Sequence, residues 1–134
     1  MKKIVFILLI GLLISCEKEA KFIPNENLVD FQRHTIMDMD ELVDSGEENY
    51  LILNSEKFNS NTDTIRFENG FIYVSYLSIV NGCGQYAGNI EIKNDSIFLK
   101  LVDTVGIACA EQRVDRLVYK IKNNGNKKYE IKKW

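Results

Sequence analysis

The most reactive side chains in this chain of 134 residues are three cysteines and one histidine. Cys16 follows an apolar run near the N-terminus, whereas Cys83 and Cys109 lie in the second half of the chain. A thiol can be acylated, can join a second thiol in a disulfide, or can ligate a soft metal ion as its thiolate. Which of these reactions occurs depends on the compartment in which the chain matures, and the N-terminal segment determines that compartment.

The first 15 residues have the composition of an export signal. Lys2 and Lys3 form a positively charged start, and an apolar run from Ile4 to Ile14 follows them. About 20 apolar residues are needed to span a bilayer, and this run is roughly half as long. We therefore expect residues 1–15 to be removed rather than retained as a membrane helix.

The end of this run, Leu13-Ile14-Ser15-Cys16, resembles the lipobox of bacterial lipoproteins. The resemblance implies that the Cys16 sulfur receives a diacylglycerol and that the acylated cysteine becomes the first residue. Two or more acyl chains hold a protein firmly on a membrane without crossing it. The alternative is an ordinary secretory signal with a chance cysteine.

Cleavage before Cys16 leaves 119 residues, a length that suits one domain with one core. We predict that residues 16–27 form a tether, because they are charged and include the only proline. Residues 28–134 are predicted to form a single β-rich domain. Glu17-Lys18-Glu19 resembles the acidic sorting signals of some outer-membrane lipoproteins. Basic residues fall from 17 to 15 against 19 acidic ones, so the mature formal charge is −4 and nucleic acid is not an expected partner.

Cys83 and Cys109 remain as a pair once Cys16 is acylated. Each is expected in a connection beside a strand, where a cross-link can join two loops without bending a sheet. In an oxidising compartment such a pair predicts a disulfide, which would stabilise the fold by about 3 kcal/mol on the chain-entropy model. A redox-active pair or a soft-metal site is the less favoured reading, because there is no Cys-x-x-Cys and no further ligand nearby.

The segment from Leu28 to Val43 has a loose helical spacing of apolar residues. We expect one helix or two short ones here, the second capped by Asp38 or Asp40. The only histidine, His34, would lie one helical turn from Asp38, but no second histidine or cysteine completes a ligand set, so we predict a surface histidine and no metal or cofactor. The acidic residues 38–48 also lack the spacing of an EF-hand.

From Asn49 onward the pattern is that of strands, with apolar and polar residues alternating around turn residues. Asn69-Gly70 is typical of a two-residue hairpin turn, because both residues tolerate positive φ. The fold class is therefore predicted as mainly β, an antiparallel meander curled into a half-barrel or small barrel, with a short N-terminal helical segment. The predicted hairpins join residues 64–68 with 71–78, 90–93 with 97–101, and 117–122 with 129–131.

The strand from Phe71 to Val80 is apolar on both sides. A central strand covered on both faces, with the N-terminal helix as one cover, explains this pattern and is the interpretation that we favour. The alternative is a strand that lends tyrosines to a ligand groove, since tyrosine combines an apolar ring with a polar tip. The candidate groove residues are Tyr73, Tyr76 and Tyr86.

Two cysteine-containing segments, Gly82 to Gly88 and Ile107 to Glu111, have Leu117 shortly after them. Together, the stretch from Gly82 to Ile121 resembles the META domain, a small exported β domain with a Gly-Cys segment and a later Ala-Cys segment. The resemblance implies a fold and a compartment. It implies no catalytic residue.

No catalytic motif is visible: there is no nucleophile elbow, no phosphate-binding glycine loop and no His-Glu-x-x-His. We therefore predict a non-catalytic binding or structural module in the cell envelope, anchored through Cys16, on the outer membrane in periplasmic or surface-facing orientation. Its ligand would be a protein or a small molecule. The alternative is an immunity-type inhibitor whose acidic residues 38–48 bind a basic toxin, and a third reading is a META-like stress or resistance protein.

Overall fold

The computed structural model describes residues 22–37 and 63–133. The predicted signal, Cys16, most of the predicted tether and the acidic residues 38–48 lie outside this part of the chain. The described residues form seven strands: β1 (Leu28–Met37), β2 (Thr64–Glu68), β3 (Phe71–Asn81), β4 (Tyr86–Lys93), β5 (Ser96–Asp103), β6 (Gln112–Lys122) and β7 (Glu130–Lys133).

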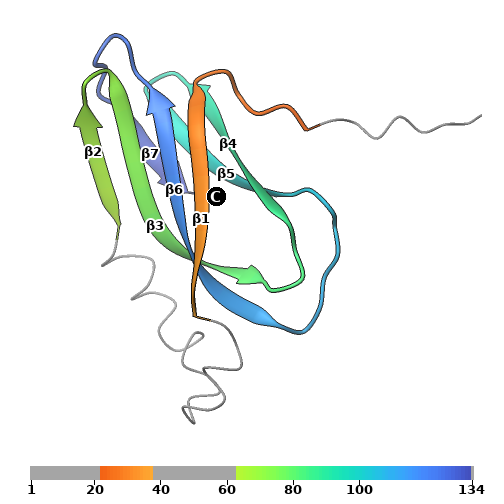
Figure 1. The fold of residues 1–134 in the computed structure, drawn as a ribbon. Coiled ribbons are helices and arrows are strands. Elements are labelled where there is room, and N and C mark those ends of the chain that lie inside the picture. The colour runs from red at the N-terminus through yellow and green to blue at the C-terminus, as the bar shows by residue number, and fades with distance from the viewer. Residues whose placement is uncertain (1–21, 38–62, 134) are drawn as a thin grey trace, which may run out of the picture.

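The strands form two sheets, which face each other as the layers of a sandwich (Figure 1). The first sheet has the order β1-β6-β3-β2 and is antiparallel throughout. The second has the order β4-β5-β7, in which β4 and β5 are antiparallel but β5 and β7 are parallel. The prediction of a mainly β fold is confirmed. The predicted meander is wrong, and the described strands do not close into a barrel.

The core lies between the two sheets. From the first sheet, β3 and β6 contribute Ile72, Val74, Tyr76, Leu117, Tyr119 and Ile121, and from the second, β4 and β5 contribute Ile90, Ile97 and Leu99. On each strand these residues are two apart, because successive side chains of a strand point to opposite faces. Burial of this one face of each sheet is the main source of stability in such a fold.

Tyr119 connects the sheets at the centre of this core. Its ring lies 4.9 Å from the ring of Phe31 and is stacked on that of Tyr76 at 6.0 Å. Its hydroxyl donates a hydrogen bond to the carbonyl oxygen of Lys100 on β5, over 2.9 Å. The buried phenol therefore has its polar atom satisfied by the opposite sheet, as burial of a tyrosine requires.

β3 is a central strand, between β6 and β2. Its residues Ile72, Val74 and Tyr76 face the core, whereas Phe71 and Tyr73 on the other face are half-buried. The Lys120 ammonium group lies 4.6 Å from the ring centre of Phe71 and 5.6 Å from that of Tyr73. Cationic side chains thus cover part of the outer face, where the sequence predicted a helix.

Two of the three predicted hairpins are confirmed. β2 and β3 pair around Asn69 and Gly70, both of which have positive φ, at 50° and 79°. β4 and β5 pair around Asn94 and Asp95, and Asn94 also has positive φ. Asparagine and glycine tolerate this left-handed conformation, which is why the turn chemistry identified both hairpins.

The third predicted hairpin is wrong. Both edges of β6 are already paired, with β1 and with β3, so β7 has no free edge of β6 to join. The turn at residues 123–126 instead carries the chain from the first sheet to the second, where β7 pairs with β5. The Asn123 side chain holds this turn by donating a hydrogen bond to the Lys127 carbonyl and accepting one from the Lys127 amide.

The helix predicted from Leu28 is also wrong over the described residues, because residues 28–37 form β1. Two irregularities in the pairing with β6, at Leu28/Asp30 and Thr35/Met37, shift the alternation of side chains along the strand. Such bulges destroy the period of two that would reveal a strand in the sequence. The rest of the predicted helix, residues 38–43, lies outside the described residues, and the described part holds no helix able to cross a membrane.

Gly88 on β4 lets the two sheets approach each other beside β1. A Cβ atom at this position would lie 2.3 Å from two ring atoms of Phe31, whose ring packs on Tyr119. Real Cβ atoms do not approach other atoms so closely, so any side chain at residue 88 must displace Phe31 from the core.

We expect Gly88→Ala to lower the free energy of unfolding by about 1–3 kcal/mol, the usual cost of overfilling a packed core. Urea unfolding followed by fluorescence measures the change. Gly125→Ala is the matched control, because no atom lies within 4 Å of the added methyl group. An equal effect of the two substitutions would contradict the close contact between β4 and β1.

Alkaline pH should destabilise the domain through its buried tyrosines. Burial raises the pKa of Tyr119, and of Tyr76, above the usual value of 10. Both phenols are protonated in the folded state, so their contribution to stability is complete below pH 10 and is lost as the pH rises above it. We expect Tyr119 to lower the stability by about 1.4 kcal/mol per pH unit above pH 10, and Tyr76 to act in the same direction.

Unfolding free energies of the wild type and of Tyr119→Phe, measured between pH 9 and pH 11.5, test this expectation. The variant loses the hydrogen bond to Lys100, so its stability is lower below pH 10. The slope of its unfolding free energy against pH should nevertheless be smaller, because the variant releases about one proton fewer on unfolding. Parallel pH profiles would show that Tyr119 ionises freely in the folded domain.

Candidate functional site

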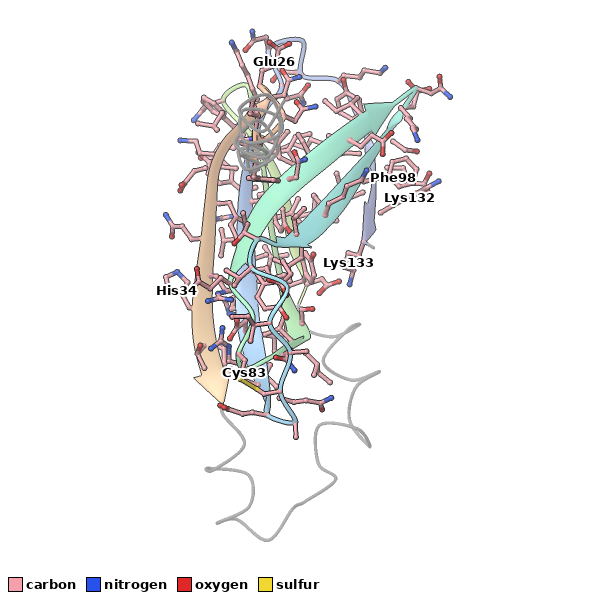
Figure 2. All side chains as sticks on the ribbon, turned by 90° about the vertical axis from the view of Figure 1, so that its right-hand side faces the viewer. Glu26, His34, Cys83, Phe98, Lys132 and Lys133 are labelled. Atoms are coloured by element: carbon pink, nitrogen blue, oxygen red, sulfur yellow. A yellow bond between two sulfur atoms is a disulfide. The ribbon has the colours of Figure 1, made fainter. Side chains whose placement is uncertain are left out.

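The sandwich has two chemically different ends. At one end, which we call the turn end, the turns at 69–70, 94–95 and 123–126 meet the point at which the chain enters β1. Backbone hydrogen bonds join these segments: the Asn123 amide donates to the Gly70 carbonyl over 2.7 Å, and the Lys122 amide to the Asn27 carbonyl over 2.8 Å. The cysteines lie at the opposite end, which we call the disulfide end. Figure 2 shows Glu26 and Cys83 at these two ends.

The turn end contains a pocket of ≈ 260 Å³. Two lysines and no acidic residue line it, together with amide side chains, one tyrosine and one isoleucine. The lining residues are Asn27, Ile92, Lys122, Asn123, Asn124, Gly125, Lys127 and Tyr129.

The two lysines of the pocket are held differently. The Lys127 ammonium group lies 2.7 Å from the Asp95 carboxylate and 5.0 Å from the ring centre of Tyr129, and Asp95 raises the pKa of Lys127. Lys122 is exposed and forms no side-chain hydrogen bond or ion pair within residues 22–37 and 63–133. The pocket therefore presents one positioned and one unpaired ammonium group.

Chemically, the described lining residues of this pocket can bind a polar ligand. Ammonium and amide groups donate hydrogen bonds to anionic or hydroxyl-rich ligands, and the tyrosine ring offers an apolar surface. A nucleophile activated by an adjacent base, which covalent catalysis requires, is absent from the lining.

At the disulfide end, Cys83 and Cys109 form a disulfide with a Cα–Cα distance of 5.8 Å, as the sequence predicts. Asn81, the last residue of β3, organises both cysteine loops. Its side-chain oxygen accepts hydrogen bonds from the amides of Cys83 at 3.1 Å and Cys109 at 3.2 Å, and its amide nitrogen donates to the Cys109 carbonyl. The loops after β3 and before β6 are therefore fixed covalently and by one shared side chain.

Glu111 lies beside the disulfide, so that Cys83, Cys109 and Glu111 form a group of three metal-ligand side chains with donor atoms within 4.8 Å of one another. Thiolates, not disulfide sulfurs, ligate soft metals in proteins. With both sulfurs oxidised, this group offers a metal ion only the carboxylate.

A buried ion cluster lies further along the inner face of the first sheet. The Asp115 side chain is fully buried and lies 3.3 Å from the Nε atoms of both Arg33 and Arg113. Arg113 also donates a hydrogen bond to the Gly82 carbonyl at 3.2 Å, and the Arg33 guanidinium lies 5.4 Å from the ring centre of Tyr86. The cluster thus links β1 and β6 to the cysteine loop.

Two positive charges surround one negative charge in this cluster. The Nη1 atom of Arg33 and the Nη2 atom of Arg113 are buried without a hydrogen-bond partner in the described structure. Burial of an ion pair costs desolvation free energy that the attraction between the charges only partly offsets. The arrangement therefore fixes the orientation of the strands more than it adds to their stability.

The three tyrosines proposed for a ligand groove occupy separate environments. Tyr76 faces the core and is stacked on Tyr119, whereas Tyr73 lies on the opposite face of β3 under Lys120 and Arg66. Tyr86 lies at the disulfide end, where its hydroxyl accepts a hydrogen bond from the Asn81 amide at 3.1 Å. The structure does not bring these residues together around one surface.

His34 lies on β1, where its side chain is exposed. Because this segment is a strand, residues 34 and 38 do not have the spacing of a helical turn that the metal-site reading assumed. Asp38 itself lies outside the described residues.

Sequence reasoning missed both the pocket and the ion cluster. The pocket combines residues from three separate segments, the entry to β1, the end of β4, and the end of β6 with the connection after it, and no local pattern indicates that these segments meet. The cluster had a weak signal, because Arg113 and Asp115 are two apart and so share a face of β6, but the predicted strand began only at Leu117. Its second arginine, Arg33, lies in the segment for which a helix was predicted.

Comparisons of the chain with protein-family models, with curated proteins and with solved structures find no match.

We expect Asp115→Asn to lower the free energy of unfolding by about 3 kcal/mol, because the substitution leaves two partly buried guanidinium groups without an anion. Chemical unfolding measures this change. Asp30→Asn is the matched control: Asp30 is exposed and accepts a hydrogen bond only from Gln32 within the described residues, so its substitution should change stability little.

Proposed function

We propose that the protein is a lipid-anchored lipoprotein of the bacterial cell envelope that acts as a non-catalytic binding or structural module. The observation that carries the proposal is the Leu13-Ile14-Ser15-Cys16 sequence after a short, positively charged apolar segment. The folded part of the chain begins soon after it, with residue 25 already hydrogen-bonded to β4. A small domain directly behind an acylated cysteine is held at the membrane surface.

The disulfide supports maturation outside the cytosol, where disulfides form and persist. It joins the two segments on which the resemblance to the META domain depends, residues 82–88 and 107–111. The proposed location is the outer membrane, with the domain facing the periplasm or the cell surface.

The turn-end pocket is the binding site that this proposal assigns. Its lysines, amides and single tyrosine favour a polar ligand with negative charge or several hydroxyl groups. Arg33, Arg113 and Asp115 at the disulfide end are bonded to one another and to the backbone, which supports a structural role for that end. The acidic residues on which the toxin-inhibitor alternative depends lie outside the described residues, so the described surface offers no argument for it.

Radiolabelled palmitate should enter the wild-type protein, and the Cys16→Ser variant should incorporate none. The variant should also leave the membrane fraction, because the chain loses its acyl chains. Labelling is measured by autoradiography of the purified protein, and intact mass spectrometry checks for loss of residues 1–15.

Cys83→Ser with Cys109→Ser is the matched control, because this double variant removes the other two thiols and should still be labelled. Equal incorporation into the wild type and Cys16→Ser would refute the anchor. Absence of label from a wild-type protein that retains residues 1–15 would do the same.

A further inference from the structure

We propose that the turn end of the sandwich rests on an anionic phospholipid surface, and that its pocket receives phosphate headgroups of that surface. This inference rests on the proposed anchor at Cys16. It adds which face of the domain meets the membrane and which chemical group the pocket binds.

The length of the chain before the domain restricts which end can reach the membrane. Phe22 is six positions after Cys16, so this segment spans at most about 22 Å when fully extended. The chain then joins the turn end: the Asn25 amide donates a hydrogen bond to the Asn89 side chain at 2.8 Å, and Asn27 lines the pocket. The turn end is therefore the part of the domain nearest to the anchored cysteine.

The disulfide end is too far from Cys16 to contact the membrane when the turn end faces it. β6 runs the length of the sandwich and has 11 residues, which corresponds to about 36 Å. Its first residues lie at the disulfide end and its last residue, Lys122, lies in the pocket at the turn end. Figure 1 shows β1 and β6 running side by side between these ends.

The pocket has the charge that a phosphate group requires. Among the described residues Lys122 supplies an unpaired ammonium group, and Lys127 supplies a second one that is ion-paired at 2.7 Å with Asp95, a residue outside the lining. Glu26 and Glu68 lie at the same end of the domain but outside that lining. Each ammonium group close to an anionic membrane raises the membrane-binding constant by about fivefold.

Ile23 offers an exposed apolar side chain on the segment that leads into the turn end. Its side chain is 79% exposed, two residues before the hydrogen bond that fixes Asn25 to β4. A single exposed isoleucine is ordinary on a protein surface, but in the sequence this one lies between the proposed anchor and Asn27, the first residue of the pocket lining. The aromatic ring of Tyr129 in the pocket adds a side chain of the type that prefers membrane interfaces.

Lysine footprinting of the acylated full-length mature protein tests this arrangement. The protein is incorporated into vesicles of phosphatidylcholine with about 30 mol % phosphatidylglycerol, and separately into detergent micelles, and is then treated with an acetylating reagent. We expect Lys122 to be acetylated at least about fivefold more slowly in the anionic vesicles. Lys132 is the internal control, because it is paired with Glu130 on β7, beside Phe98 in Figure 2, and its rate should be the same in both.

Three outcomes would overturn the inference: equal reactivity of Lys122 in vesicles and micelles, equal protection of Lys132, or protection of Lys122 in micelles by millimolar inorganic phosphate alone. The last would identify the pocket as a site for free phosphate. Intact mass is measured on the same sample. A chain without acyl groups refutes the anchor, whereas an acylated chain with a reactive Lys122 refutes only the membrane contact.

The variant Lys122→Gln gives a second readout, with Lys132→Gln as a control of equal charge change. Acetylation of Lys127, the second lysine of the pocket lining, should become faster in anionic vesicles when Lys122 is replaced and should not change when Lys132 is replaced. An unchanged Lys127 rate in both variants would contradict a shared headgroup site.

Discussion

The contact of Tyr119 with both sheets is the interaction on which the rest of the structure depends. Its ring packs against Phe31 of β1 and Tyr76 of β3, and its hydroxyl is bonded to the backbone of β5. One side chain therefore fixes the spacing of four strands. Because strand pairing has a period of two residues, a shift of β6 by one position would turn Tyr119 to the outer face and expose the whole apolar set of that strand.

The inner face of β6 changes character along its length. Leu117, Tyr119 and Ile121 form the apolar part, whereas Arg113 and Asp115, on the same face, form the charged part. The apolar part supplies stability through burial, and the charged part has low net energetic value but strict geometric requirements. The sandwich therefore has a stable centre and an end whose arrangement is specified by ion pairs, one asparagine and a disulfide.

The features predictable from sequence were those encoded by neighbouring residues. Asn69-Gly70 identified one hairpin through its tolerance of positive φ, and the alternation around Asn94 identified another. The disulfide between Cys83 and Cys109 followed from the count of thiols after the proposed acylation of Cys16. Each of these inferences needs only local geometry or an even number of cysteines.

The features that could not be predicted depend on contacts between distant residues. β1 pairs with β6 across 77 to 93 positions of the sequence, and its bulges removed the alternation that indicates a strand. β7 resembled the second arm of a hairpin, and only knowledge that both edges of β6 were occupied would have assigned it to the other sheet. The pocket was hidden for the same reason, since its lining comes from segments that meet only after the sheets have formed.

The two ends of the domain are joined in physically different ways, which bears on where a ligand can bind. At the disulfide end a covalent bond, the Asn81 side chain and the Asp115 cluster use the polar groups of the connections, leaving few of them for another molecule. At the turn end, backbone hydrogen bonds hold the turns, and the Asn123 side chain donates a hydrogen bond to the Lys127 carbonyl. The side chain of Lys122 is not needed for that framework. The end that the chain enters from the N-terminus is thus the end whose side chains are available for binding, and this links the proposed position of the anchor to the position of the pocket.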